Sequence, residues 1–213
     1  MKNIAVLVSG GGTNLQALID AEKAGELPGG KISLVISSKK SVYALERAEK
    51  HNIKTAVVEW LEFKPNRKEY SAEILKLLLE HNIELVIYAG FMVILDECVC
   101  REFRNKMLNV HPALIPSFSG EGYYGLRIHE AVLESGVKLT GATVHFVNEV
   151  CDGGPIILQK AVEVKNDDTP ESLQKRVMEE AEQILLPLAA ALFCEDRIEV
   201  VGNRAIITNS LTI

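Results

Sequence analysis

Short apolar runs alternate with amphipathic stretches over about the first 110 residues of the chain. The runs are rich in Val and Ile, and the stretches between them repeat apolar positions every three or four residues, which predicts strands separated by helices. Strands are predicted at residues 4–8, 32–36, 55–58, 84–88 and 107–110, and helices at residues 14–24, 42–51 and 66–81. This alternation is typical of an α/β fold with a doubly wound, mostly parallel Rossmann-like sheet.

The pattern changes in the second half of the chain. Residues 140–147 and 156–164 alternate like antiparallel edge strands, and a long helix is predicted over residues 170–193. Two short strands, 198–201 and 205–208, flank Gly202-Asn203 and predict a C-terminal hairpin. We therefore expect a single domain over residues 1–208 and a frayed tail over residues 209–213.

The ends of two predicted helices share a dipeptide. His51-Asn52 follows the second helix and His81-Asn82 follows the third. A histidine favours the dipole of a last helical turn, and Asn tolerates the left-handed conformation that follows it. These two histidines are therefore interpreted as helix stops and not as site residues.

A glycine-rich loop joins the first strand to the first helix. In Ser9-Gly10-Gly11-Gly12-Thr13-Asn14, three glycines let backbone N–H groups face an anion at a helix N-terminus. The loop lacks the Lys of a phosphate-binding G-K-[ST] motif and the third Gly of a dinucleotide fingerprint, so a nicotinamide enzyme is disfavoured. The alternative is a tight turn with Thr13 as the helix N-cap.

Polar side chains suited to acid–base chemistry lie at the end of the fifth predicted strand and in a later turn. Asn109 and His111 are two residues apart, so both point to the same side of a strand and toward one ligand atom. Asp152 lies in the turn Cys151-Asp152-Gly153-Gly154-Pro155. If this turn lies over the strand end, the Asp152 carboxylate is expected to raise the pKa of His111. By itself, Asp-Gly-Gly is common in surface turns.

Composition and charge narrow the class of protein. The chain has 213 residues, of which 47% are hydrophobic and 24% charged, and a net charge of −6. The totals exclude a disordered chain and give no support to a basic nucleic-acid face. No apolar run approaches the ~20 residues that span a bilayer, and no secretory leader is recognised. We expect a cytoplasmic protein with four free, buried thiols, since the cysteines have no metal-ligand spacing.

Five segments occur in one order and spacing: S-G-G-G-T-N at 9–14, A-G-F-M at 89–92, L-N-V-H-P-A-L-I-P at 108–116, G-A-T-V-H-F-V at 141–147 and D-G-G-P-I-I-L-Q at 152–159. Together they resemble the folate-dependent glycinamide ribonucleotide transformylases, from residue 1 to about residue 208. The resemblance implies the formyltransferase fold and transfer of a formyl group from 10-formyltetrahydrofolate to the amine of 5-phosphoribosylglycinamide in purine (IMP) synthesis. It implies small-molecule substrates, no metal, and a monomer or homodimer.

The resemblance also implies roles for individual residues. Asn109, His111 and Asp152 are the implied catalytic set: Asn109 and protonated His111 stabilise a tetrahedral oxyanion, and Asp152 keeps His111 charged and assists proton transfer through a water. The implied contacts to phosphoribosylglycinamide are Gly12, Thr13, Asn14 and Glu182; those to folate are Arg67, Met92, Val93, Ile94, Leu95, Asn109, Asn148, Glu149, Val150 and Cys151. Without the resemblance, residues 91–95 fit a core segment equally well, Arg67 fits a solvated helix start, and Glu182 fits an exposed helix carboxylate.

Several positions depart from the family pattern. The loop 117–125 is longer than in many relatives, and Arg127 stands where a histidine is frequent, although His129 is retained. Arg127 is always charged, so it keeps anion binding and cannot shuttle protons. Gln183 replaces a frequent histidine and Val93 a frequent basic residue. His145 is predicted to support the site or to pack in the core.

Related activities remain as alternatives. Formyltetrahydrofolate deformylases and methionyl-tRNA formyltransferases share the N-x-H-P motif and the catalytic acid. They also carry additional domains, and we expect this chain to have no room for them. A non-catalytic nucleotide-binding regulatory module is the remote alternative, and such a module is expected to lose Asn109, His111 and Asp152 first. All three are present.

Overall fold

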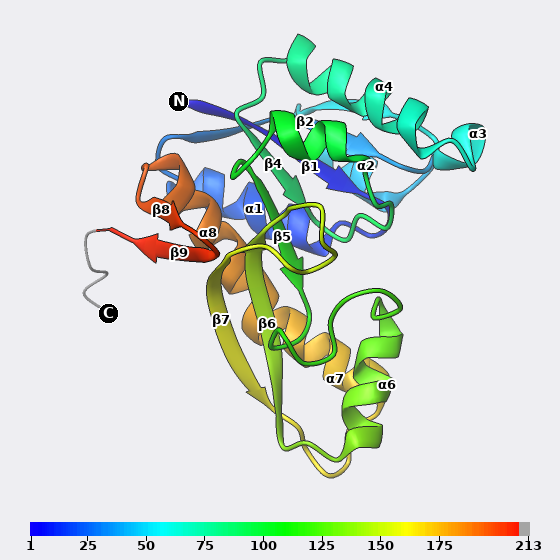
Figure 1. Cartoon of the computed structure of the whole chain (residues 1–213), viewed down its shortest axis with the longest axis vertical. Coiled ribbons are helices and arrows are strands. Elements are labelled where there is room, and N and C mark those ends of the chain that lie inside the picture. Colours follow the sequence, from blue (N-terminus) through cyan, green and yellow to red (C-terminus); the bar gives the residue numbers. More distant parts are fainter. Residues whose placement is uncertain (209–213) are drawn as a thin grey trace.

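A seven-stranded sheet forms the centre of the protein (Figure 1). The computed structural model describes residues 1–208, and the expected frayed tail at 209–213 lies outside them. The strand order is β3-β2-β1-β4-β5-β6-β7; β1 to β5 are parallel, and β6 and β7 each run antiparallel to the preceding strand. The strands are β1 Lys2–Val8, β2 Gly30–Ser37, β3 Lys54–Val57, β4 Leu85–Tyr88, β5 Met107–His111, β6 Leu139–Phe146 and β7 Ile156–Glu163. The doubly wound, mostly parallel sheet is confirmed.

Helices cover both faces of this sheet. They are α1 Thr13–Ala24, α2 Tyr43–Lys50, α3 Trp60–Phe63, α4 Arg67–Glu80, α5 Glu97–Glu102, α6 Leu126–Ser135, α7 Pro170–Val177 and α8 Gln183–Cys194. Three of them, α3, α5 and α6, lie outside the predicted elements. The first two are too short to show helical periodicity, and α6 buries a histidine, His129, among its apolar positions. No helix within residues 1–208 is both long and apolar enough to span a bilayer.

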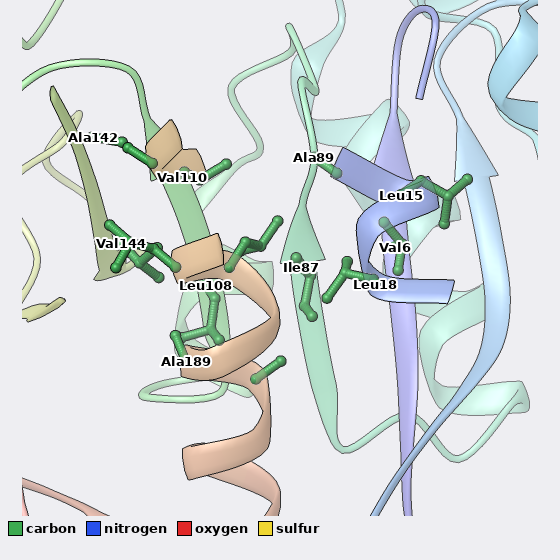
Figure 2. Packing of buried hydrophobic residues seen from close by; sticks show 14 of the residues in the cluster. Val6, Leu15, Leu18, Ile87, Ala89, Leu108, Val110, Ala142, Val144 and Ala189 are labelled. Atoms are coloured by element: carbon green, nitrogen blue, oxygen red, sulfur yellow. The ribbon is translucent and has the colours of Figure 1, made fainter. Parts of the chain in front are cut away.

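The sheet separates two hydrophobic clusters. Along β1, Ile4, Val6 and Val8 face one cluster, whereas Ala5 and Leu7 face the other, as the two-residue period of a strand requires. In Figure 2, side chains of α1 and α8 pack on the first face; the labelled residues are Val6, Leu15, Leu18, Ile87, Ala89, Leu108, Val110, Ala142, Val144 and Ala189. Both faces of the parallel strands are thus buried, which explains their continuous apolar runs.

The two helix stops predicted from His-Asn pairs are confirmed. His51 and His81 are the C-cap residues of α2 and α4. Asn52 and Asn82 follow with φ of 56° and 51°, the left-handed conformation that Asn tolerates.

The long helix is interrupted by a wider turn. Residues 170–194 are helical, but Met178–Glu182 form a π-helical segment between α7 and α8. Pro187, one turn later, has no N–H to donate to the carbonyl of Gln183. The wider turn contains Glu182 and lies beside β6.

The C-terminal hairpin is also confirmed. Strands β8 Ile198–Val201 and β9 Arg204–Ile207 pair antiparallel about the Gly202-Asn203 turn. The strand β9 contacts β7, so the hairpin extends the antiparallel side of the molecule.

Candidate active site

Polar side chains gather at one edge of the sheet, where β1, β4 and β5 end. The strand β4 pairs Tyr88 with Asn109, and β6 places His145 opposite Asn109 and Thr143 opposite His111. His111 is buried with 4% of its surface exposed, and Asn109 is half-buried. In open α/β sheets the ligand site lies at this carboxyl edge.

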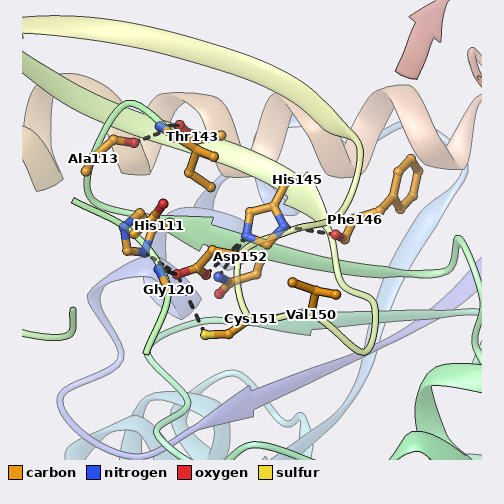
Figure 3. Close-up of polar contacts among 12 residues, drawn as sticks. His111, Ala113, Gly120, Thr143, His145, Phe146, Val150, Cys151 and Asp152 are labelled. Atoms are coloured by element: carbon orange, nitrogen blue, oxygen red, sulfur yellow. Dashed lines mark hydrogen bonds and ion pairs between the residues drawn. The ribbon is translucent and has the colours of Figure 1, made fainter. Parts of the chain in front are cut away.

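Asp152 connects the two histidines of this edge. Its Oδ2 lies 3.5 Å from Nδ1 of His111, and its Oδ1 lies 3.6 Å from Nε2 of His145. Figure 3 shows the carboxylate between the two rings, and the N–H of Gly120 donates to Oδ2 over 2.9 Å. The structure therefore brings Asp152 over the strand end that holds Asn109 and His111, as expected from the sequence.

Backbone carbonyls fix the protonated nitrogen of each ring. Nε2 of His111 lies 2.8 Å from the carbonyl oxygen of Phe118, and Nδ1 of His145 lies 2.9 Å from that of Phe146. A backbone carbonyl can only accept a hydrogen bond, so Nε2 of His111 and Nδ1 of His145 each carry a proton and donate it. Nε2 of His145 then accepts from the amide of Asn109 over 3.1 Å. His145 is thus a partner that orients Asn109, one of the two roles predicted for it.

The pKa of His111 departs from the sequence-based expectation of a raised value. Burial lowers the pKa of His111 below 6.5, although the Asp152 carboxylate acts in the opposite direction. Burial also opposes ionisation of Asp152, but His145, the charge of His111 and the N–H of Gly120 outweigh it and hold the Asp152 pKa at about 2. In the ligand-free protein the Asp152 carboxylate raises the pKa of His111, as expected, but desolvation of the ring has the larger effect and lowers it.

The loop 117–125 folds back over this cluster. In this loop the carbonyl of Phe118 accepts from Nε2 of His111, and the N–H of Gly120 donates to the carboxylate of Asp152. The sequence gives no signal for either contact, because both use backbone groups. The longer loop thus occupies one hydrogen-bonding position on each of the two ionisable residues.

A buried hydroxyl supports the chain between His111 and this loop. Thr143 donates to the carbonyl of Ala113 over 2.7 Å and accepts from the N–H of Ile115 over 3.1 Å. Gln159 donates to the same Thr143 oxygen over 2.9 Å. Strands β6 and β7 therefore hold the path of the loop as well as the sheet.

A cavity of about 550 Å³ opens beside Asp152. It lies between the 115–120 segment, the 151–156 turn and the tip of the terminal hairpin. The cavity leaves room for a reactant or a water next to the carboxylate.

The glycine-rich loop enters α1 as a left-handed turn. Gly12 precedes the helix with φ of 72°, and a Cβ at this position would lie 2.7 Å from Cβ of Ala44. The first helical bond runs from Gln16 N to Gly12 O, so the N–H groups that begin α1 have no partner within the helix. Thr13 is the first helical residue, which contradicts the alternative that it is the N-cap. The loop retains the free donors required of an anion site.

Asn14 and Glu182 form a buried pair behind this loop. Nδ2 of Asn14 donates to Oε2 of Glu182 over 2.7 Å, and Oδ1 of Asn14 is buried without a protein partner. Burial raises the pKa of the Glu182 carboxyl. Glu182 is not an exposed helix carboxylate, because the π-helical turn directs it inward, whereas Glu179 and Glu180 face solvent.

The apolar segment after β4 divides its side chains between solvent and core. Met92 and Ile94 are 53% and 56% exposed, whereas Val93 and Leu95 are buried in the second hydrophobic cluster. Ser9 accepts from the N–H of Met92 over 3.0 Å, which joins the end of β1 to this segment. The segment therefore serves the core and offers two exposed apolar side chains beside the site.

Of the remaining predicted folate contacts, Asn148 is half-buried and the others are exposed. Arg67 is the first residue of α4, and Glu149, Val150 and Cys151 lie in the loop before Asp152. Asn148 accepts from the N–H of Val150 over 3.0 Å and so shapes the start of that loop. No contact joins Arg67 to the Asp152 cluster among the described residues.

The cysteines are free but not all buried. Cys100 and Cys194 are buried, Cys98 is half-buried, and Cys151 is exposed beside Asp152. The expectation of four buried thiols is wrong at Cys98, which lies on the partly exposed side of α5, and at Cys151, which lies in an exposed turn. Within residues 1–208, no group of three or more His, Cys, Asp and Glu side chains is arranged to hold a metal ion.

His129 and Arg127 lie on α6, behind the loop. His129 is fully buried, and neither ring nitrogen has a protein partner. Burial and the nearby His111 lower the pKa of His129 to about 4. Arg127 is exposed and stacks on Tyr124, with its guanidinium 5.0 Å from the ring centroid.

Comparisons with known proteins show the family of this chain. The model of the formyl transferase family matches residues 2–189. The chain is 40% identical to phosphoribosylglycinamide formyltransferase of Haemophilus influenzae over 96% of the chain and 93% of that protein. It is 43% identical to the human trifunctional purine biosynthetic protein adenosine-3 over 94% of the chain, and spans 19% of that longer protein.

A solved structure gives the same assignment. Glycinamide ribonucleotide transformylase 1 of Symbiobacterium toebii superposes with a TM-score of 0.91 at 39% identity, covering 98% of this chain and 95% of that one. The family model covers most of the chain, and the matched region contains Asn109, His111 and Asp152. The chain therefore belongs to the formyl transferase family.

Proposed function

We propose that the protein transfers the formyl group of 10-formyltetrahydrofolate to the amine of 5-phosphoribosylglycinamide, in the synthesis of purines. The observation that carries this proposal is the cluster of Asn109, His111 and Asp152 at the carboxyl edge of the sheet. An amide, an imidazole and a carboxylate are the groups that an acyl transfer to an amine requires.

The glycine-rich loop supports a phosphorylated acceptor. The N–H groups at the start of α1 have no partner within the helix, and the helix dipole favours an anion there. The first turn of α1 contains no acidic residue that would compete with phosphate. Gly12, Thr13 and Asn14 are the proposed phosphate contacts, and Glu182 lies one hydrogen bond from Asn14, where it can meet a polar group of the acceptor.

The reaction forms one C–N bond and breaks another. The acceptor amine attacks the formyl carbon, and the formyl oxygen becomes a tetrahedral oxyanion near Asn109 and His111. Collapse of this intermediate breaks the bond to the folate nitrogen, which takes up a proton as the attacking nitrogen loses one. In the proposal Asp152 relays this proton through a water. Nε2–H of His111 has to turn from the Phe118 carbonyl to the oxyanion.

The proposed folate site lies between the segment after β4 and the loop 148–151. Met92 and Ile94 offer exposed apolar surface for a flat pterin, and Val93 and Leu95 support their segment from within the core. The 148–151 loop is the proposed opposite wall, with Asn109 at the reactive end. Arg67 is the proposed cation for the anionic glutamate tail.

Formyltetrahydrofolate deformylase is the second candidate function. It needs water in place of the amine acceptor and uses the same three polar groups, so the cluster alone does not separate the two activities. The free N–H groups of the glycine-rich loop favour the phosphorylated acceptor.

The test is a paired assay. Purified protein is mixed with 10-formyltetrahydrofolate, with and without 5-phosphoribosylglycinamide, and folate absorbance is followed. Turnover that requires the acceptor supports the proposal. Equal turnover without the acceptor identifies a deformylase, and absence of turnover in both mixtures favours the regulatory module.

Asp152→Asn tests the electrostatic link within the site. The carboxylate raises the pKa of His111 against the effect of burial, so its removal is expected to lower that pKa further. The measurement is a pH titration of the His111 ring protons by NMR in the ligand-free protein. Wild type should titrate below pH 6.5 and the variant lower still. A His111 pKa that stays unchanged in the variant contradicts the link.

A further inference from the structure

We propose that Arg47, which lies outside the glycine-rich loop, is a positioning residue for the phosphate of the acceptor. The guanidinium Nε donates to the carbonyl of Gly11 over 2.9 Å, and Nη1 donates to Oε1 of Gln16 over 3.0 Å. Arg47 therefore joins α2 to both the loop and the first turns of α1. The inference rests on the proposed function and extends it to a residue 36 positions from the loop.

The start of α2 fixes two consecutive peptide groups of the loop. Ala44 N donates to the carbonyl of Gly10 over 3.2 Å, and Arg47 holds the carbonyl of Gly11. In a trans peptide unit the N–H points opposite to the C=O. With both carbonyls directed at α2, the N–H groups of Gly11 and Gly12 are directed away from it, where an anion can accept from them.

Sterics do not provide this orientation. A Cβ at Gly10 or Gly11 would meet no atom within 4 Å, so both residues lie in open space. Glycine in open space adopts many backbone conformations. The two hydrogen bonds from α2 therefore decide which way the peptide groups of Gly10 and Gly11 point.

Arg47 is itself held in place. Its guanidinium lies 4.7 Å from the centroid of the Tyr43 ring and uses two nitrogens for the bonds described above. The planar guanidinium can hold two acceptors in fixed directions, which the single ammonium of lysine cannot do. Arg47 also lies beside the loop that is proposed to bind the phosphate.

The test compares Arg47→Met with Lys50→Met. Lys50 lies on the same helix with its Nζ 5.2 Å from the same Tyr43 ring, so its removal deletes the same charge without deleting a bond to the loop. We expect Arg47→Met to raise KM for 5-phosphoribosylglycinamide at least 10-fold, with kcat and the folate KM within threefold of wild type. Lys50→Met should keep all three within twofold.

Two further comparisons separate positioning from charge and from folding. Arg47→Lys keeps the charge and loses the two-point contact, so its acceptor KM should lie closer to Arg47→Met than to wild type. An acceptor analogue without phosphate should show the same KM with wild type and Arg47→Met. Circular dichroism and urea unfolding check that the Arg47 and Lys50 variants fold.

The outcomes distinguish this inference from the proposed function. If wild type does not formylate the acceptor, the proposed function fails. If wild type is active and Arg47→Met leaves the acceptor KM unchanged, or Arg47→Lys behaves as wild type, the positioning role alone is wrong.

Discussion

Asn109→Ala is expected to reduce kcat by ~10²–10³, which corresponds to about 3–4 kcal/mol of lost transition-state stabilisation. The amide of Asn109 is oriented by His145 at the edge where β5 ends, which allows its remaining donor to meet the developing oxyanion. The acceptor KM should change only a few-fold, because the donor matters most when the negative charge forms. Steady-state kinetics with saturating 10-formyltetrahydrofolate measure both constants.

His111→Ala belongs to the same prediction and should show a similar loss. If Asn109 and His111 stabilise one oxyanion, the double variant should lose far less than the product of the two single effects. Multiplicative losses would place the two side chains in separate steps. A loss below tenfold in both single variants would contradict the proposed site.

Asn3→Ala is the matched control for Asn109→Ala. Asn3 is also half-buried, donates to the carbonyl of Asn82 and accepts from Ser33, but it lies at the opposite end of β1. It should cost about 1 kcal/mol in free energy of unfolding, as lost hydrogen bonds do. Its kcat should equal that of wild type, so a loss of kcat in Asn3→Ala would mean that the assay reports stability.

Gly154→Ala is expected to displace Asp152 and reduce kcat at least 10²-fold. A Cβ on Gly154 would lie 1.8 Å from the carbonyl oxygen of Phe146, which is backbone and cannot rotate away. The carbonyl of the next residue, Pro155, accepts from Phe146 N over 2.9 Å. The turn is therefore bonded to the end of β6 at the same residue whose carbonyl faces Gly154. Overpacking of this kind costs about 1–3 kcal/mol in free energy of unfolding.

Gly153→Ala is the control within the same turn. A Cβ there would lie 2.6 Å from Cγ1 and 2.7 Å from Cβ of Val150, so the exposed loop that carries Val150, and not the backbone of β6, would have to shift. Its kcat should stay within a few-fold of wild type. If Gly154→Ala displaces Asp152, the pKa of His111 should fall as in Asp152→Asn. Equal activity of the two glycine variants would show that the turn tolerates the added methyl group.

Much of the fold follows from local signals. Buried parallel strands show as continuous runs of Val and Ile, and the His-Asn pairs end α2 and α4 as predicted, because helix stops depend on the conformation of one or two residues. The helices α3 and α5 escape prediction because one turn or two gives too few positions for a period to appear.

The sequence by itself predicted the doubly wound architecture, the glycine-rich loop and the pair Asn109 and His111, because spacing along a strand and turn chemistry are local. The place of Asp152 was implied only by the resemblance to the family, because its turn is common on protein surfaces. Only the tertiary structure decided the direction in which the pKa of His111 departs from its ordinary value, since that direction depends on desolvation by distant segments. It also decided the inward direction of Glu182 and the contact of Arg47 with Gly11. These features join residues far apart in the chain, and no local pattern specifies which distant group will remove water or donate a hydrogen bond.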